Sequence, residues 1–217
     1  MKKLYFIYTI PDFYNALYKP VMYREFERKD DLIVRFTADT SLLQETLANN
    51  VIPSKTTKQR LFGFAKCAEA DGADCIVVGC TAINTATKEI SQMLETPMFS
   101  IDEPMIQAVL ADGHKKIAVL SHTPINAGTI KRRLLAEDPG LTVDLYPVEG
   151  AKEAFEKGDM DELRALLKKG AENIPEGYDC IVCGHISAED TDFSRISVPV
   201  YRTGEYAIKA INRSLKG

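Results

Sequence analysis

The sequence predicts an α/β protein of two pseudosymmetric, Rossmann-like domains with mainly parallel sheets. One stretch occurs twice: residues 74–85 read D-C-I-V-V-G-C-T-A-I-N-T, and residues 179–187 read D-C-I-V-C-G-H-I-S. An acidic residue, a β-branched apolar run and a glycine fit a buried strand of a parallel sheet and the loop at its end. Residues 2–11 and 115–124 also match, since both open with two lysines and close on proline.

The length of the repeat indicates duplicated domains, because the copies lie much further apart than the roughly 20–50 residues of a solenoid repeat. Residues 97–99 correspond to residues 199–201, which indicates that the end of the chain returns to the first half. We therefore expect a first domain of residues 1–97 plus 200–217 and a second domain of residues 98–199. Ligands bind at the carboxyl ends of strands in open α/β sheets, so an active-site cleft between the halves is expected.

In the first half, apolar runs between turn residues predict strands, and apolar residues at helical spacing predict helices. Leu61, Ala65 and Ala68 share one helix face, and Gly72 stops that helix. The strands are expected at residues 4–10, 32–36, 97–101 and in the central run before Cys80, and the helices from near Phe13, at 42–47, 58–71 and 85–94, and from Asp102-Glu103-Pro104 onward.

The second half repeats this pattern. Asn126, Gly128 and Thr129 favour a loop after Pro124, with a helix only from Ile130. The strands are expected at residues 116–121, 141–146, 180–183 and 199–201, and the helices at 130–137, 149–155, 159–173 and after Gly204.

Composition and charge narrow the class of protein. The 217 residues are 45% hydrophobic and 27% charged, with a net charge of −4, which is typical of a globular protein and gives no footprint for nucleic acid or an acidic membrane. No apolar run reaches the roughly 18–20 residues that span a bilayer. The lysines and apolar run at the N-terminus resemble a signal peptide, but their internal copy favours a first strand. The sequence leaves a homo-oligomer open.

The five cysteines indicate a reducing, cytoplasmic compartment, because their number is odd. Cys180 and Cys183 are three residues apart within a predicted strand, where they point to opposite faces. We therefore predict no metal site.

Cys80 is the first candidate for chemistry, because it follows the central strand and a glycine. Near a helix N-terminus, backbone N–H groups lower the pKa of a thiol and also bind an anion. The alternative is a small buried hydrophobe, which is how we interpret the other cysteines, Cys67, Cys75, Cys180 and Cys183.

Histidines supply the second candidates. His185 occupies the repeat position equivalent to Cys80 and can titrate near neutral pH. His122 ends the strand that corresponds to the one ending at Thr9, whereas His114 precedes a strand and is assigned to the surface. Asp102 and Glu103 fit either an acid–base pair or helix capping, and we favour capping.

At these residues the chain resembles the Asp/Glu/hydantoin racemase superfamily. The resemblance rests on G-C-T-A-I-N-T at residues 79–85, S-I-D-E-P-M at 100–105, A-V-L-S-H-T-P at 118–124 and E-G-A-K-E-A-F-E-K-G-D at 149–159. It implies cofactor-independent chemistry at the carbon next to a carboxylate. Two-base members of the superfamily place one cysteine in each half; Cys80 matches the first, and His185 stands where the second would be. Single-cysteine relatives catalyse other reactions, including decarboxylation.

The leading hypothesis is a cofactor-independent racemase or isomerase that acts on a small carboxylate-bearing substrate such as an acidic amino acid. Cys80 would be one acid/base and His185 the other or its partner. The alternatives are a single-cysteine decarboxylase or lyase and a non-catalytic carboxylate-binding protein. A nucleotide site is disfavoured, because no G-x-G-x-x-G or G-x-x-x-x-G-K motif is present. Polar side chains expected to bind the substrate are Thr9, Thr81, Asn84, Thr85, His122, Thr123 and Ser187.

Overall fold

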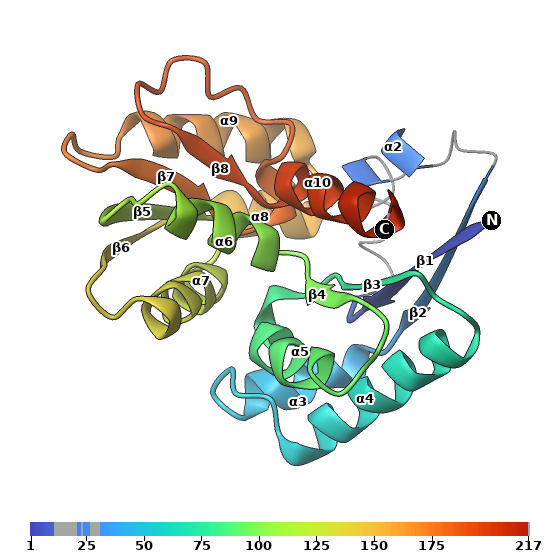
Figure 1. The fold of residues 1–217 in the computed structure, drawn as a ribbon. Coiled ribbons are helices and arrows are strands. Elements are labelled where there is room, and N and C mark those ends of the chain that lie inside the picture. Colours follow the sequence, from blue (N-terminus) through green and yellow to red (C-terminus); the bar gives the residue numbers. More distant parts are fainter. Residues whose placement is uncertain (11–20, 23, 27–30, 217) are drawn as a thin grey trace. The chain divides into compact units, whose positions relative to one another are not determined.

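A computed structural model describes residues 1–10, 21–22, 24–26 and 31–216 (Figure 1). The helix expected near Phe13 therefore lies outside the described residues. Contacts divide the chain into two units, Met1–Glu103 with Ala207–Gly217 and Pro104–Tyr206.

The described residues of the first unit form a four-stranded parallel sheet with the strand order β2-β1-β3-β4. Every residue of β3 is buried, which explains why the central strand of the repeat is an unbroken apolar run rather than an alternating one. The strands are β1 (Lys2–Tyr8), β2 (Leu32–Ala38), β3 (Cys75–Val78) and β4 (Met98–Ser100).

Two helices of the first unit begin at side-chain caps. Asp39 accepts a hydrogen bond from the N–H of Ser41, and Ser54 accepts one from the N–H of Thr57. Leu42, Leu61 and Ile90 from three of these helices share one core with Ile76 of the sheet. The helices are α2 (Arg24–Phe26), α3 (Thr40–Ala48), α4 (Lys55–Ala70) and α5 (Asn84–Ser91), with a short turn of 3-10 helix, η2 (Thr81–Ile83), before α5.

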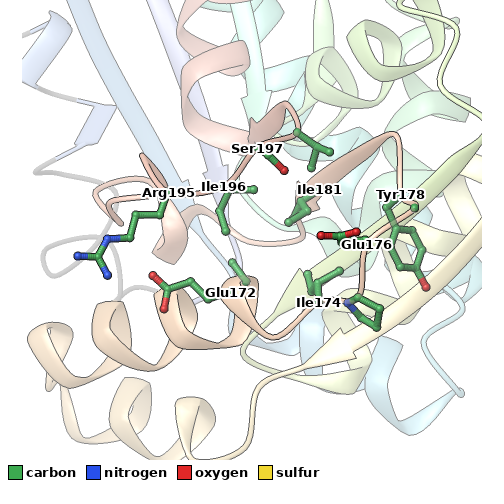
Figure 2. A pocket seen from close by; sticks show the side chains of 12 residues that line it. Glu172, Ile174, Glu176, Tyr178, Ile181, Arg195, Ile196 and Ser197 are labelled. Atoms are coloured by element: carbon green, nitrogen blue, oxygen red, sulfur yellow. The ribbon is translucent and has the colours of Figure 1, made fainter.

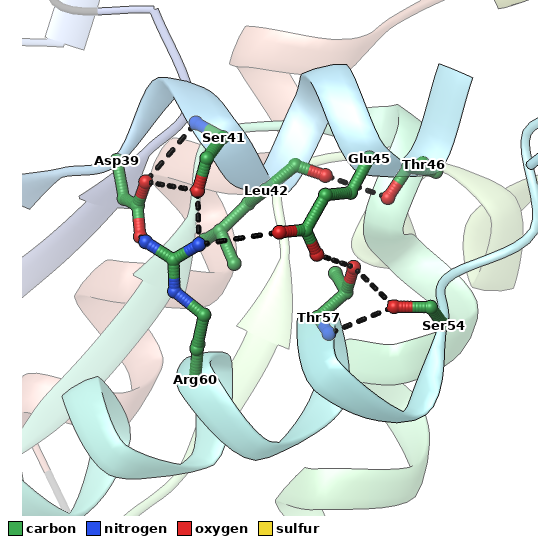
Figure 3. A network of polar contacts seen from close by, with 8 residues as sticks. All are labelled: Asp39, Ser41, Leu42, Glu45, Thr46, Ser54, Thr57 and Arg60. Atoms are coloured by element: carbon green, nitrogen blue, oxygen red, sulfur yellow. Dashed lines mark hydrogen bonds and ion pairs between the residues drawn. The ribbon is translucent and has the colours of Figure 1, made fainter. Parts of the chain in front are cut away.

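A polar network ties α3 to α4 (Figure 3). The Arg60 guanidinium of α4 pairs with the Asp39 carboxylate and also donates to the Ser41 hydroxyl. Its Nη1 lies 3.4 Å from Glu45 Oε1, and the Thr57 hydroxyl donates to Glu45 Oε2 at 3.2 Å. The cap residue of α3 is thus held by the neighbouring helix.

The second unit repeats the arrangement, with four parallel strands in the order β6-β5-β7-β8 among its described residues. β7 is buried at every position, as β3 is. The strands are β5 (Lys116–Ser121), β6 (Thr142–Pro147), β7 (Cys180–Cys183) and β8 (Val200–Arg202). The helices are α6 (Glu103–Ala111), α7 (Pro124–Glu137), α8 (Ala151–Lys157), α9 (Met160–Glu172) and the 3-10 turn η3 (Ile186–Ala188). The last helix, α10 (Thr203–Lys216), begins in this unit and continues into the first, which contains Ala207–Gly217.

The loop expected after Pro124 is wrong, because α7 begins at Pro124. The Thr123 hydroxyl caps this helix by accepting the N–H of Asn126 at 3.1 Å. Proline at the first helical position needs no N–H partner and already has a helical φ, so this cap outweighs the turn tendency of Asn126 and Gly128.

The two sheets confirm the predicted fold class, since both are four-stranded, parallel and connected in the same order. β4 pairs with β3 and β8 pairs with β7. Contacts place the passages of the chain between the units after Glu103 and after Tyr206, and the boundaries expected from the sequence stay a prediction. In α10, Ser214 hydrogen-bonds Cys75 of the first sheet. Among the described residues, no helix has both the length and the apolarity to cross a bilayer.

Two helical glycines are expected to respond oppositely to alanine. A Cβ at Gly63 in α4 would meet nothing within 4 Å, whereas one at Gly170 in α9 would lie 2.6 Å from Val148 Cγ2 and 3.3 Å from Leu120 Cδ1. Gly63→Ala should raise the free energy of unfolding by about 0.5–1 kcal/mol, through helix propensity alone. Gly170→Ala should lower it by about 1 kcal/mol, because overpacking costs about 1–3 kcal/mol. Urea unfolding of both variants measures this, and equal shifts would contradict the close packing at Gly170.

Candidate functional site

Cys80 lies at the carboxyl end of β3, in the position that the repeat predicts. The N–H of Gly79 donates to the carbonyl of Ile7 at 2.9 Å, which holds the end of the strand beside β1. Cys80 has an extended backbone and directly precedes η2 and α5. Its side chain is 9% exposed, and the Thr9 hydroxyl forms a hydrogen bond with its thiol. The segments that follow β1 and β3 thus meet at the Cys80 sulfur.

Burial raises the pKa of the Cys80 thiol. The hydrogen bond from Thr9 and the backbone N–H groups of Ala82 and Ile83 act in the opposite direction, and the Asp102 carboxylate adds to the rise. The lowered pKa expected from the helix N-terminus is therefore wrong for this unliganded state, because desolvation of a buried thiolate outweighs three donors. At neutral pH the thiol holds its proton.

Asp102 directly precedes α6, where the sequence predicts a helix cap, and it is fully buried and belongs to the surroundings of Cys80. It accepts a hydrogen bond from Asn84 Nδ2 at 2.7 Å, so the start of α5 is tied to the segment after β4. The repeat shows an equivalent of the contact between Asn84 and Asp102 in the second unit. Glu189 is the counterpart of Asn84, and its carboxylate accepts the N–H of Gly204 at 2.9 Å, where Gly204 is the counterpart of Asp102.

The polar residues of the first half that are expected to bind the substrate differ in their contacts and in their exposure. Thr9 contacts the thiol, and Thr81 is buried directly after it. Asn84 is engaged by Asp102. Thr85 is partly exposed within α5. Thr9 is therefore the expected substrate-binding residue in contact with the sulfur.

His185 lies at the carboxyl end of β7 and caps η3. Its Nδ1 accepts a hydrogen bond from the backbone N–H of Ser187 at 3.2 Å. The residue as a whole is partly exposed. Its ring centroid lies 4.5 Å from that of His122 and 5.5 Å from that of Phe155. His122 and His185, predicted from two separate strand ends, are thus brought together.

Burial lowers the pKa of His122 to about 4, and the nearby Glu156 carboxylate only partly offsets this. Burial, and secondly the charge of His122, hold the pKa of His185 well below its usual value. Both imidazoles are neutral at pH 7. Phe155, which packs on both rings, was missed by the sequence analysis, although it lies in the run at residues 149–159.

Two buried polar atoms of this cluster have no hydrogen-bond partner in the part of the chain that the structure describes: His122 Nδ1 and Ser187 Oγ. Thr123, by contrast, uses its hydroxyl oxygen to cap α7. Of the polar residues expected in this half, His122 and Ser187 are therefore those beside His185.

Nothing in the described ranges groups three His, Cys, Asp or Glu side chains around a metal position. Burial raises the pKa of Cys180 and of Cys183 to about 12, so neither thiol is a ready ligand. A cavity of about 440 Å³ lies before β7 and β8, lined by Glu172, Tyr178 and Arg195 among others (Figure 2). It opens at the amino ends of these strands, away from His185.

The fold and the strand-end residues define a class of α/β protein with duplicated parallel sheets and a thiol at the carboxyl end of one central strand. The sequence profile of one family, Asp/Glu/Hydantoin racemase, matches residues 22–211. The chain belongs to the Asp/Glu/hydantoin racemase family. Among curated proteins, no sequence matches it.

Solved structures share the fold at low identity. An aspartate racemase homologue from Pyrococcus horikoshii OT3 is 21% identical, covers 100% of both chains and has a TM-score of 0.65. The aspartate racemase of Picrophilus torridus is 14% identical, with 100% of this chain and 95% of that one covered and a TM-score of 0.70. A glycine-to-cysteine mutant of arylmalonate decarboxylase is 17% identical, with 99% and 94% covered and a TM-score of 0.64. That Cys80 and His185 share one cleft stays a prediction.

Proposed function

We propose that this protein is a cofactor-independent racemase or isomerase that transfers a proton at the carbon α to the carboxylate of a small acidic substrate, with Cys80 as the group that exchanges the proton. The observation that carries the proposal is the setting of the Cys80 sulfur. It lies at the carboxyl end of a central parallel strand, with the Thr9 hydroxyl and the N–H groups of Ala82 and Ile83 beside it.

These three donors fit a thiol that must ionise during a reaction. Burial keeps the resting thiol protonated, whereas hydrogen bonds to the sulfur stabilise the thiolate that would remove an α-proton. The electron pair of the broken C–H bond would move into the substrate's carboxylate, and the thiol so formed would return a proton to carbon. The donors thus limit the cost of the charged state without making it the resting state.

Solvent exchange tests the proposal directly. Single enantiomers of aspartate, glutamate and hydantoin-type acids, incubated with the protein in D₂O, should gain deuterium at the α-carbon of at least one compound, as followed by ¹H NMR. Absence of exchange for every acid would count against the racemase.

A single-thiol decarboxylase is the second candidate, and the protonation state of Cys80 favours it. A protonated thiol can give a proton to the carbanion left when CO₂ departs, and no base is needed to begin that reaction. The fold shared with a decarboxylase variant is compatible with this chemistry but does not establish it. CO₂ release from malonate-type acids, with one solvent deuteron in the product, would support this candidate. Binding of an acid with neither exchange nor CO₂ release would favour a carboxylate-binding protein.

A further inference from the structure

Three rings form a cluster at the carboxyl end of the second sheet: His122 after β5, Phe155 on α8 and His185 after β7. His122 and His185 meet edge to face at 64°, and Phe155 lies 4.6 Å from His122 between ring centroids. His122 is 5% exposed and Phe155 is 7% exposed, whereas His185 keeps part of its surface open. Of the two histidines, His185 is therefore the less buried residue.

One hydrogen bond defines where His185 carries its proton. The N–H of Ser187 donates to Nδ1 at 3.2 Å, so Nδ1 must present a lone pair. A neutral imidazole has one donor nitrogen and one acceptor nitrogen, and the proton accordingly lies on Nε2. An imidazolium would carry a proton on both nitrogens and would lose the contact with Ser187.

Neither nitrogen of this tautomer is available as a base. Nδ1 is occupied by Ser187, and Nε2 already holds a proton. A general acid or base must gain or lose a proton near the working pH, and gaining one here would break the cap of η3. The tautomer instead supplies a fixed N–H donor.

We propose that His185 is a neutral hydrogen-bond donor, through Nε2–H, to the carboxylate of the substrate, and that it is not a second acid/base for carbon. The inference rests on the proposed function, because it assigns a role toward the same substrate. The substrate class is a small carboxylic acid whose oxygens gain negative charge when the α-carbon loses a proton or CO₂. A donor aligned in advance stabilises this charge without moving its own proton.

The charges around the cluster agree with a neutral pair. The titratable groups that bear on these rings are the two histidines themselves and Glu156, which acts on His122. Burial dominates at both rings and disfavours their cationic forms. The two imidazoles should therefore become charged only at acid pH and should stay uncharged near pH 7.

The proposal has a stereochemical consequence. Cys80 alone takes the α-proton and returns one, and its thiol exchanges with D₂O between the two steps. Return to the face that lost the proton restores the starting enantiomer, and the opposite enantiomer forms only when the planar intermediate turns its other face to the thiol. For an acid that undergoes exchange, deuterium should therefore enter the starting enantiomer faster than the opposite enantiomer accumulates. Two acid/bases would place solvent deuterium mainly in the opposite enantiomer.

Three substitutions separate the roles that His185 could have. In His185→Gln, the amide N–H₂ stands near the place of Nε2–H and retains a donor. In His185→Asn, the side chain can still cap η3, since asparagine is a preferred N-cap, but it lacks the distant donor. His185→Leu lacks both.

If His185 is a donor, the rate of α-proton exchange in His185→Gln should stay within about tenfold of the parent rate. In His185→Asn and His185→Leu the exchange rate should fall by about 10²–10³-fold. An acid/base role predicts instead that Gln and Asn both fall by about 10²–10⁴-fold. A merely structural role predicts that Asn, which keeps the cap, retains the parent rate. Either of the last two patterns would overturn the proposal.

The protonation state of His185 can also be measured without a substrate, so this inference can be tested independently of the proposed function. In the full chain labelled with ¹⁵N-histidine, assigned by comparison with His185→Gln, the His185 signals should show a neutral ring with Nε2–H from pH 8 to pH 6. A cationic ring or an Nδ1–H tautomer would refute the inference. If this pattern is found and no acid exchanges or loses CO₂, the proposed function fails while the state of His185 stands.

Discussion

Replacing Cys80 with alanine should reduce α-proton exchange by about 10²–10⁴-fold, the range for loss of a positioned acid/base. Thr9 and the N–H groups of Ala82 and Ile83 surround the sulfur, and in the alanine variant they would have no group through which to move a proton. Deuterium incorporation followed by ¹H NMR, on the acid that the parent exchanges, measures the effect.

Two control variants make the result specific. Cys67 is exposed near the end of α4, so Cys67→Ala should leave exchange unchanged. Cys80→Ser keeps the size and polarity of the side chain but raises the pKa of the group that must ionise, so it should lose nearly as much activity as alanine. Full exchange in Cys80→Ala, with an unchanged thermal transition, would remove the thiol from the chemistry.

The protein should lose about 2 kcal/mol of stability between pH 7 and pH 5 through His122 alone. The pKa of His122 is lowered to about 4 in the folded state by burial, whereas an unfolded histidine titrates near pH 6.5. Between these values the unfolded chain binds a proton that the folded protein does not, so the free energy of unfolding rises with pH. His185 acts in the same direction, because its pKa is lowered too.

Urea unfolding at half-unit steps from pH 7 to pH 5 measures this slope. This window lies above the range in which carboxylates with lowered pKa, such as Glu69, lose their contribution. His122→Phe preserves a ring against Phe155 and removes the titrating group, so its slope should be clearly shallower than that of the parent. An unchanged slope in His122→Phe would show that His122 is not held neutral by the fold.

Local sequence was sufficient to predict the strands that carry the site. β5 and β7 match their expected limits, because a β-branched apolar run between turn residues has few other solutions. The start of α7 was missed, since the loop tendencies of Asn126 and Gly128 were weighed without the cap that Thr123 supplies. Where helix and loop tendencies of the local sequence are similar in strength, the hydrogen bonds that the folded chain completes decide which structure forms.

The chemical state of the site was not predictable in the same way. Helix position suggested a lowered thiol pKa, yet Cys80 is governed by burial and by Asp102. Desolvation sums over every neighbour that excludes water, and those neighbours come from separate segments of the chain. Likewise His122, Phe155 and His185 meet only because β5, α8 and β7 are packed together.

The sequence by itself determined the duplication, the parallel sheets and the equivalence of Cys80 and His185 in the repeat. These features depend on local pattern and on self-similarity along one chain. Only the tertiary structure decided that the thiol is protonated and that the proton of His185 lies on Nε2. Both depend on solvent exclusion and on single hydrogen bonds, from Thr9 to the sulfur and from Ser187 to Nδ1. These are properties of the packed chain that no local pattern encodes.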